Sequence, residues 1–128
     1  MKYGRWVLVL FGVSLLVAPL QGHHSFAATY LEQELVEIDG DITEFQYKNP
    51  HAWVHLSGQD GAGKAKTWAA EWASVSRLER AGISQETLKP GDTVRIWAAP
   101  NRDPNDHRVH LKRIVRRSDG WKWGQARP

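Results

Sequence analysis

The sequence predicts a small, mostly β domain with one short helix. Apolar and polar residues alternate with a period of two in several runs of the chain, which is typical of half-buried strands. Turn signals rich in Gly, Pro, Asn and Asp separate these runs. The chain has 128 residues, which is enough for one domain.

A signal peptide is predicted at residues 1–22. Lys2 and Arg5 precede the apolar run 6–18, which is too short to cross about 30 Å of hydrocarbon as a helix. We expect export to the periplasm or out of the cell, with no stable membrane insertion after cleavage. The alternative is an uncleaved membrane anchor.

Two cleavage positions remain open. Cleavage after Ala27 places Ser25 and Ala27 at positions where small residues are preferred. Cleavage after Gly22 places the larger Leu20 at one of these positions, and the mature chain then begins at His23.

The remaining chain divides into an N-terminal arm (23–34), a barrel domain (35–118) and a Trp-rich basic tail (119–128). Residues 31–47 carry six acidic and no basic side chains, whereas residues 107–128 carry seven basic and one acidic side chain. We expect the two charged segments to be complementary strands of one barrel; a charged docking patch is the alternative.

The first predicted strand is long and bent. Ile38 and Ile42 share its apolar face, and the apolar phase resumes at Phe45, shifted by one residue. This shift predicts a β-bulge near 43–44, which lets the strand bend.

Four further strands and a helix follow. Strands are predicted at 51–56, 66–72, 93–99 and 108–116, with a hairpin loop at 58–63. Ser74 is expected to cap a helix that runs to about Ala81, with Gly82 as its stop. One short helix between the third and fourth of five strands predicts a Greek-key barrel of the OB type.

Several segments of the chain together resemble a known family. They are 23–28 (HHSFAA), 49–53 (NPHAW), Trp68 with Glu71, and 88–94 (LKPGDTV). With these motifs the chain resembles a family of exported bacterial proteins known only as domain of unknown function 6152. The resemblance covers nearly the whole mature chain. It implies a cleaved signal, a small β-rich domain and no assigned activity.

Composition excludes several functions. The chain has no cysteine, which excludes disulfides, thiolate metal sites and cysteine nucleophiles. Loss of Lys2 and Arg5 with the signal peptide lowers the formal net charge from +3 to +1, so we expect no nucleic-acid partner. No catalytic constellation stands out, and we expect a binding protein rather than an enzyme.

The leading hypothesis is a copper site made of His23 and His51, with His24 as a competing ligand. A terminal His23 would chelate copper through its α-amino group and its imidazole, and His51 would supply a third nitrogen. The plainer interpretation is that His23 and His24 form a flexible leader and that His51 stabilises a turn.

The alternative function is metal-free binding of a small ligand or a periplasmic protein. Trp53, His55 and Trp97 fall on the polar faces of their strands, where aromatic rings can stack on ligands. Burial of these rings under neighbouring segments is the competing explanation. For Glu71 we expect an ion pair with Arg77 or Arg80, which follow on the helix.

Overall fold

Strands are the main regular structure of the molecule, with only two short helices among the described residues. The computed structural model describes residues 25–125, so the predicted signal peptide and His23 and His24 lie outside the described residues. The elements in chain order are α1 (Phe26–Thr29), β1 (Val36–Gln46), β2 (Trp53–Asp60), β3 (Ala65–Glu71), α2 (Val75–Arg80), β4 (Thr93–Pro100), β5 (Arg108–Arg116) and β6 (Lys122–Trp123). None of the helices within 25–125 has the length and apolar character needed to span a membrane.

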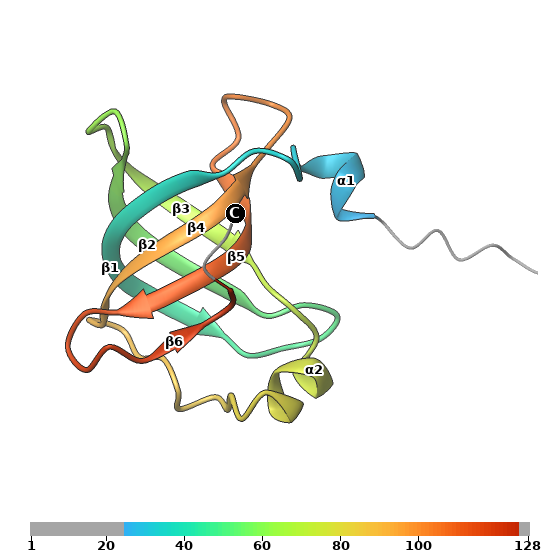
Figure 1. Ribbon diagram of the computed structural model, residues 1–128, viewed down its shortest axis with the longest axis vertical. Helices are drawn as coiled ribbons and strands as arrows, with labels where there is room; N and C mark the ends of the chain where they lie inside the picture. Colours follow the sequence, from blue (N-terminus) through green and yellow to red (C-terminus); the bar gives the residue numbers. More distant parts are fainter. Residues whose placement is uncertain (1–24, 126–128) are drawn as a thin grey trace, which may run out of the picture.

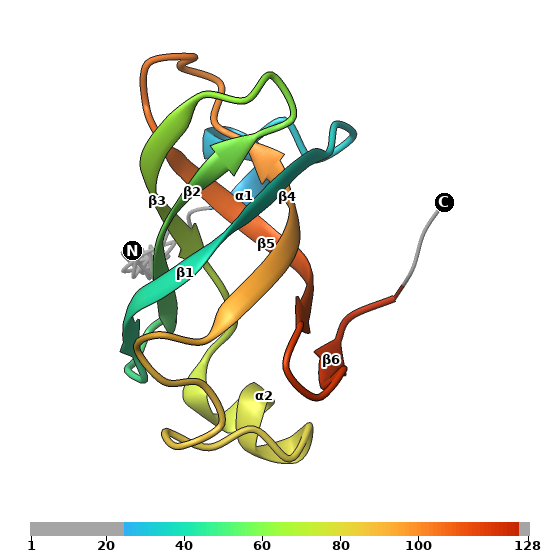
Figure 2. The same cartoon turned by 90° about the vertical axis from the view of Figure 1, so that its left-hand side faces the viewer.

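Strands β1 to β5 close into a barrel (Figure 1). The hydrogen-bonded order is β3-β2-β1-β4-β5-β6, and a parallel pairing of β3 with β5 closes the circle. The other pairings are antiparallel. Helix α2 lies at one end of the barrel, and the β2–β3 turn lies at the other (Figure 2). The predicted OB-like barrel with one short helix between the third and fourth strands is confirmed.

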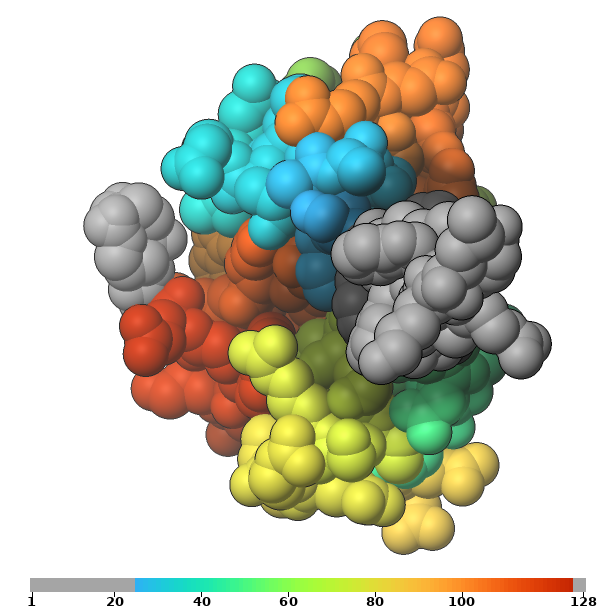
Figure 3. Space-filling model, turned by 90° about the vertical axis from the view of Figure 1, so that its right-hand side faces the viewer, coloured from blue at the N-terminus to red at the C-terminus, as the bar shows by residue number. Residues whose placement is uncertain are grey.

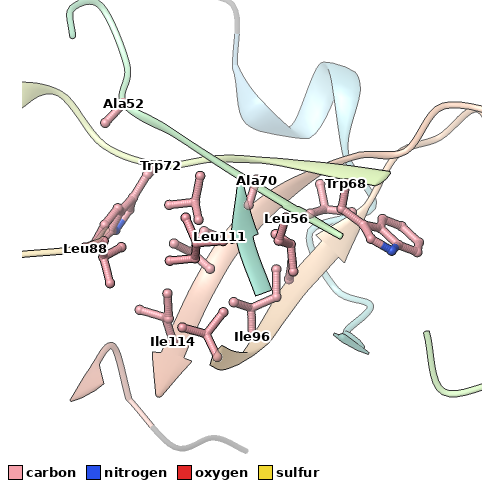
Figure 4. Close-up of a cluster of buried hydrophobic side chains, with 14 of the residues drawn as sticks. Ala52, Leu56, Trp68, Ala70, Trp72, Leu88, Ile96, Leu111 and Ile114 are labelled. Atoms are coloured by element: carbon pink, nitrogen blue, oxygen red, sulfur yellow. The ribbon is translucent and has the colours of Figure 1, made fainter. Parts of the chain in front are cut away.

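The inward faces of the strands fill the barrel (Figure 4). Fully buried side chains come from every barrel strand and include Ile38, Leu56, Ala70, Ile96, Leu111 and Ile114. Burying one Leu or Ile completely contributes about 1.5–3 kcal/mol, so this alternating pattern supplies most of the driving force for closure. Trp72, which follows β3, packs into the same core.

The predicted bulge in the first strand is confirmed. Ile42 pairs with Leu56 and Glu44 pairs with His55, so Thr43 is the additional residue in β1. The bulge allows β1 to pair with β2 on one edge and with β4 on the other.

The second strand is longer than predicted, because β2 continues to Asp60 instead of entering a loop at Gly58. Gly58 pairs with Gly40 of β1. A Cβ atom built on Gly40 would lie 2.8 Å from the Gly58 Cα and even closer to the Ser57 carbonyl oxygen. The two glycines therefore permit a close approach of the β1 and β2 backbones, and Gly58 belongs to a strand and not to the expected hairpin loop.

Helix α2 begins where the sequence predicts, directly after Ser74, but the predicted capping hydrogen bond with the Ser74 side chain is absent. Ser74 occupies the cap position, but its side chain makes no capping hydrogen bond. Instead, the Val75 N–H donates to Oδ1 of Asn49 at 3.1 Å. Asn49 precedes Pro50 through a cis peptide bond. The helix cap therefore comes from the Asn-Pro-His segment, which is distant in sequence.

The described part of the Trp-rich tail, residues 119–125, packs against the barrel. Lys122 and Trp123 form β6, which pairs with Val115 and Ile114 of β5. The Trp123 ring meets Trp72 edge-on, with ring centroids 5.0 Å apart.

Candidate metal-binding site

The closure of the barrel brings three polar or aromatic side chains into one row. Trp53 of β2 pairs with Glu71 of β3, and Glu71 pairs with His110 of β5. Their chain neighbours Val54, Ala70 and Val109 are buried in the core. Because successive side chains of a strand point to opposite faces, the row lies on the outer face at the β3–β5 seam.

Glu71 binds two side chains from other parts of the chain. The Tyr30 hydroxyl donates a hydrogen bond to one carboxylate oxygen at 2.5 Å, and Nδ1 of His51 lies 2.8 Å from the other. The predicted ion pair of Glu71 with Arg77 or Arg80 is therefore wrong. Glu71 points to the outer seam of the barrel, whereas those arginines belong to α2 at the barrel end.

Tyr30 is a buried part of this arrangement, with only 1% of its surface exposed. Burial raises the pKa of its hydroxyl, and the hydrogen bond to Glu71 raises it further. The hydroxyl therefore stays protonated and keeps donating to the carboxylate. Since a carboxylate only accepts, His51 must donate from Nδ1, which leaves Nε2 as its second nitrogen.

A second histidine is held in the same way. Nδ1 of His110 lies 2.7 Å from a carboxylate oxygen of Glu32, and the Lys112 ammonium binds the other oxygen. Partial burial raises the pKa of Glu32, but the hydrogen bonds from Lys112 and His110 lower it more, so its pKa lies below the ordinary value. Burial and the nearby Lys112 charge together lower the pKa of His110 by more than Glu32 raises it. A neutral imidazole thus donates to an ionised carboxylate.

Phe26 connects the two histidines. Its ring stacks on His110 with centroids 3.6 Å apart and lies 5.0 Å from the His51 ring. Phe26 begins α1, which Ser25 caps by accepting a hydrogen bond from Ala27. The Arg102 guanidinium anchors α1 through the Ala27 carbonyl. Figure 3 shows α1 in blue against this face of the barrel.

The arrangement is suited to metal binding because each imidazole has one nitrogen fixed by a carboxylate. Histidines that bind metals commonly donate their other ring N–H to a carboxylate, which fixes the tautomer and the ring orientation. Among residues 25–125, however, no three His, Asp or Glu side chains converge as a complete ligand set. His51 is the one predicted ligand that the structure describes, and its Nε2 is the atom that can coordinate.

The residues of the predicted metal-free site lie apart from one another. Trp53 pairs with Gln46 near one end of β1, and Trp97 pairs with Glu37 near the other. Nine positions separate these pairs along the bent strand β1, a path of at most about 30 Å. Trp97 donates to Glu37 and carries the Arg113 guanidinium 4.6 Å above its ring.

His55 is next to Trp53 rather than Trp97, with its ring centroid 6.5 Å from that of Trp53. The structure therefore places Trp53 and His55 together and Trp97 on a different part of the barrel.

Sequence reasoning did not identify Phe26, Tyr30, Glu32 or His110 as site residues. Alternation within β5 already places His110 outward, opposite the buried Val109 and Leu111. The missing information was the pairing of β3 with β5, which joins residues 39 positions apart in the Glu71–His110 pair.

Comparison with protein families supports the motif-based resemblance. A family model described as "Family of unknown function (DUF6152)" matches residues 13–110. The chain belongs to this family. The matched region includes every histidine of the chain. DUF6152 membership adds no activity, because the family itself has none assigned.

None of the curated proteins compared with the chain matches it. Among solved structures, the mitochondrial single-stranded DNA-binding protein Rim1 of S. cerevisiae is similar, with a TM-score of 0.46 and 16% identity. The alignment covers 65% of this chain and 93% of that one. A likeness of this size has no bearing on the ligand of the DUF6152 chain.

Proposed function

We propose that this exported barrel binds copper through the His23 terminus and His51 and catalyses no reaction. The observation that carries the proposal is the carboxylate-fixed His51, whose ring contacts Phe26 only three residues beyond His23. A residue spans at most about 3.6 Å of chain, so His23 lies within about 11 Å of Phe26 by connectivity alone. The His23 amine and the His51 imidazole can therefore reach one copper ion at the seam.

The packing of α1 supports cleavage after Gly22. Cleavage after Ala27 would remove Ser25, which caps the helix, and Phe26, which contacts both histidines. It would also remove the carbonyl that Arg102 binds. A segment that is built into the folded domain is better retained in the mature chain, which favours cleavage after Gly22, with His23 as the terminal residue, over cleavage after Ala27.

The donor set favours copper over other divalent ions. A terminal amine and two imidazoles offer three nitrogen ligands, and nitrogen donors bind Cu²⁺ more tightly than the other first-row divalent ions. An amine with an ordinary pKa of about 7.7–8.0 must lose its proton to bind, so affinity should rise with pH across the neutral range. His24 is the competing ligand in this scheme.

Native mass spectrometry of protein recovered from the periplasm tests the proposal. We expect a mass that begins at His23 and one copper ion per chain after copper is added. His51→Gln keeps a donor for Glu71 but removes the coordinating imidazole, so copper should be lost. His107→Gln is the matched control, because the His107 ring packs beside Trp68 and not against Phe26, which contacts the His51 ring. A chain beginning at Ala28, or copper retained by His51→Gln, would contradict the proposal.

A further inference from the structure

A cavity of about 560 Å³ lies beside the seam. It opens between α1, α2 and the β5–β6 edge, on the face shown in Figure 3. Small-molecule sites typically occupy about 300–1,000 Å³, so this volume admits an organic ligand. Phe26 and His110 form the wall that the cavity shares with the candidate metal site.

The cavity has an apolar, aromatic interior. Trp72 and Leu111 are buried core residues that reach its wall, and Trp123 of β6 adds a second indole. The two indole rings stand at 72° to each other. The indole nitrogen of Trp72 has no hydrogen-bond partner in the described part of the chain. Such walls favour the apolar body of a ligand over water.

The rim of the cavity carries positive charge. Arg77 of α2 and Lys112 of β5 line it, but the Lys112 ammonium is already bound to Glu32. Arg77 is an exposed residue, and among the described residues no carboxylate forms an ion pair with it. His110 also lines the cavity. Burial keeps the pKa of its imidazole low, so His110 is neutral near pH 7. One guanidinium is therefore available for one negative charge.

We propose that this cavity binds an amphiphilic monocarboxylate, with its apolar chain against the Trp123 and Phe26 rings and its carboxylate on Arg77. A guanidinium binds a carboxylate through two parallel hydrogen bonds, which a neutral head group cannot replace. The site goes beyond the proposed copper function: it shares one wall with the metal site but requires no metal.

Titration of n-octanoate into the metal-free protein, with a chelator present and tryptophan fluorescence as the signal, tests this site. Octanol has the same chain without the charge, and we expect it to bind at least about tenfold more weakly. Arg77→Gln should reduce octanoate affinity to that of octanol. Arg80→Gln is the matched control, because Arg80 lies on the same helix but does not line the cavity, and this variant should bind like the parent.

Trp123→Ala examines the apolar half of the site. It should weaken octanoate and octanol alike, with an unchanged far-ultraviolet circular dichroism spectrum as evidence of folding. The proposal is overturned if octanoate does not bind, if Arg77→Gln binds it as tightly as Arg80→Gln does, or if octyl phosphate binds more tightly than octanoate.

Discussion

Glu71 holds His51 in one orientation because one oxygen of the Glu71 carboxylate binds His51 and the Tyr30 hydroxyl binds the other. The two hydrogen bonds use both carboxylate oxygens, so the carboxylate cannot turn without breaking one of them. The imidazole of His51 is then fixed with Nε2 as the nitrogen that can coordinate. Positioning of this kind, one step removed from the ligand, tunes metal affinity in known metal sites.

Removal of the Tyr30 hydroxyl tests this arrangement. Tyr30→Phe leaves a partly buried carboxylate with one partner fewer, and we expect the free energy of unfolding to fall by about 1–3 kcal/mol. Urea denaturation measures the change. Tyr47→Phe removes a hydroxyl that donates to the Ile83 carbonyl from a less buried position, and its loss should be smaller. Equal losses for the two variants would contradict the assigned role of Tyr30.

His110 should make stability depend on pH. Its pKa in the folded protein is lowered by burial, against the opposing effect of Glu32. The unfolded chain therefore binds a proton more readily, and the contribution of His110 is present above about pH 6.5 and is lost as pH falls toward the folded pKa. Unfolding of the parent and of His110→Gln at several pH values gives this contribution by difference. A difference that grows as pH falls would show that the pKa is raised instead.

Local spacing explains why the partners of Glu71 were mispredicted. Arg77 and Arg80 are the basic residues that follow Glu71 most closely, and from the sequence alone closeness along the chain favours them as partners. The true partners, Tyr30 and His51, lie 41 and 20 positions away. Pairs of this separation follow from strand register, which alternation alone does not determine.

At the scale of elements, α2 begins through a contact with the Asn-Pro-His segment. Asn49 accepts from the Val75 N–H, and the Ser74 side chain makes no capping bond. The same segment positions His51 two residues later. Folding of α2 and orientation of the candidate ligand therefore depend on one turn.

Two alanine substitutions distinguish these caps. Asn49→Ala should lower the free energy of unfolding by about 1 kcal/mol, the usual value of a helix cap. Ser74→Ala should cost clearly less, because its hydroxyl caps nothing. Thermal or urea unfolding of both variants measures the difference. The reverse order would restore Ser74 as the cap.

The elements that were predicted correctly are those that alternation specifies. The phase shift before Phe45 revealed the bulge in β1, and the turn signals separated the strands. Helix α1 was not predicted, because four residues of mixed character carry no helical period. Its position comes from Arg102 and from the histidine rings, which are contacts made only in the folded chain.

For the whole molecule, barrel closure produces the fold and the candidate site together. The pairing of β3 with β5 completes the barrel and brings Glu71 beside His110. The uneven charge of the sequence is matched across the same structure. Glu32 and Asp39, from the acidic segment, form ion pairs with Lys112 and Arg117, from the basic segment. The expected complementarity of the two segments is confirmed in these pairs.

The fold class could be predicted because strand number, strand order and one helix suffice to choose an OB-like barrel. In the candidate metal site, His51 could be predicted from the Asn-Pro-His motif and from the resemblance of the chain to DUF6152. The residues around His51 could not be predicted without knowledge of the seam, because they come from the N-terminal arm, β3 and β5. Nothing in the sequence pattern specifies that these three segments meet.

In the proposed site, a free His23 amine and the His51 imidazole bind one copper ion at the seam. The most direct measurement compares Cu²⁺ affinity for the chain that begins at His23 with that for the same chain acetylated at its N-terminus. Acetylation removes the α-amine as a nitrogen ligand and leaves every described side chain unchanged. We predict that affinity falls by at least about a hundredfold, equivalent to ~2.7 kcal/mol. Equal affinity for both chains would contradict the claim.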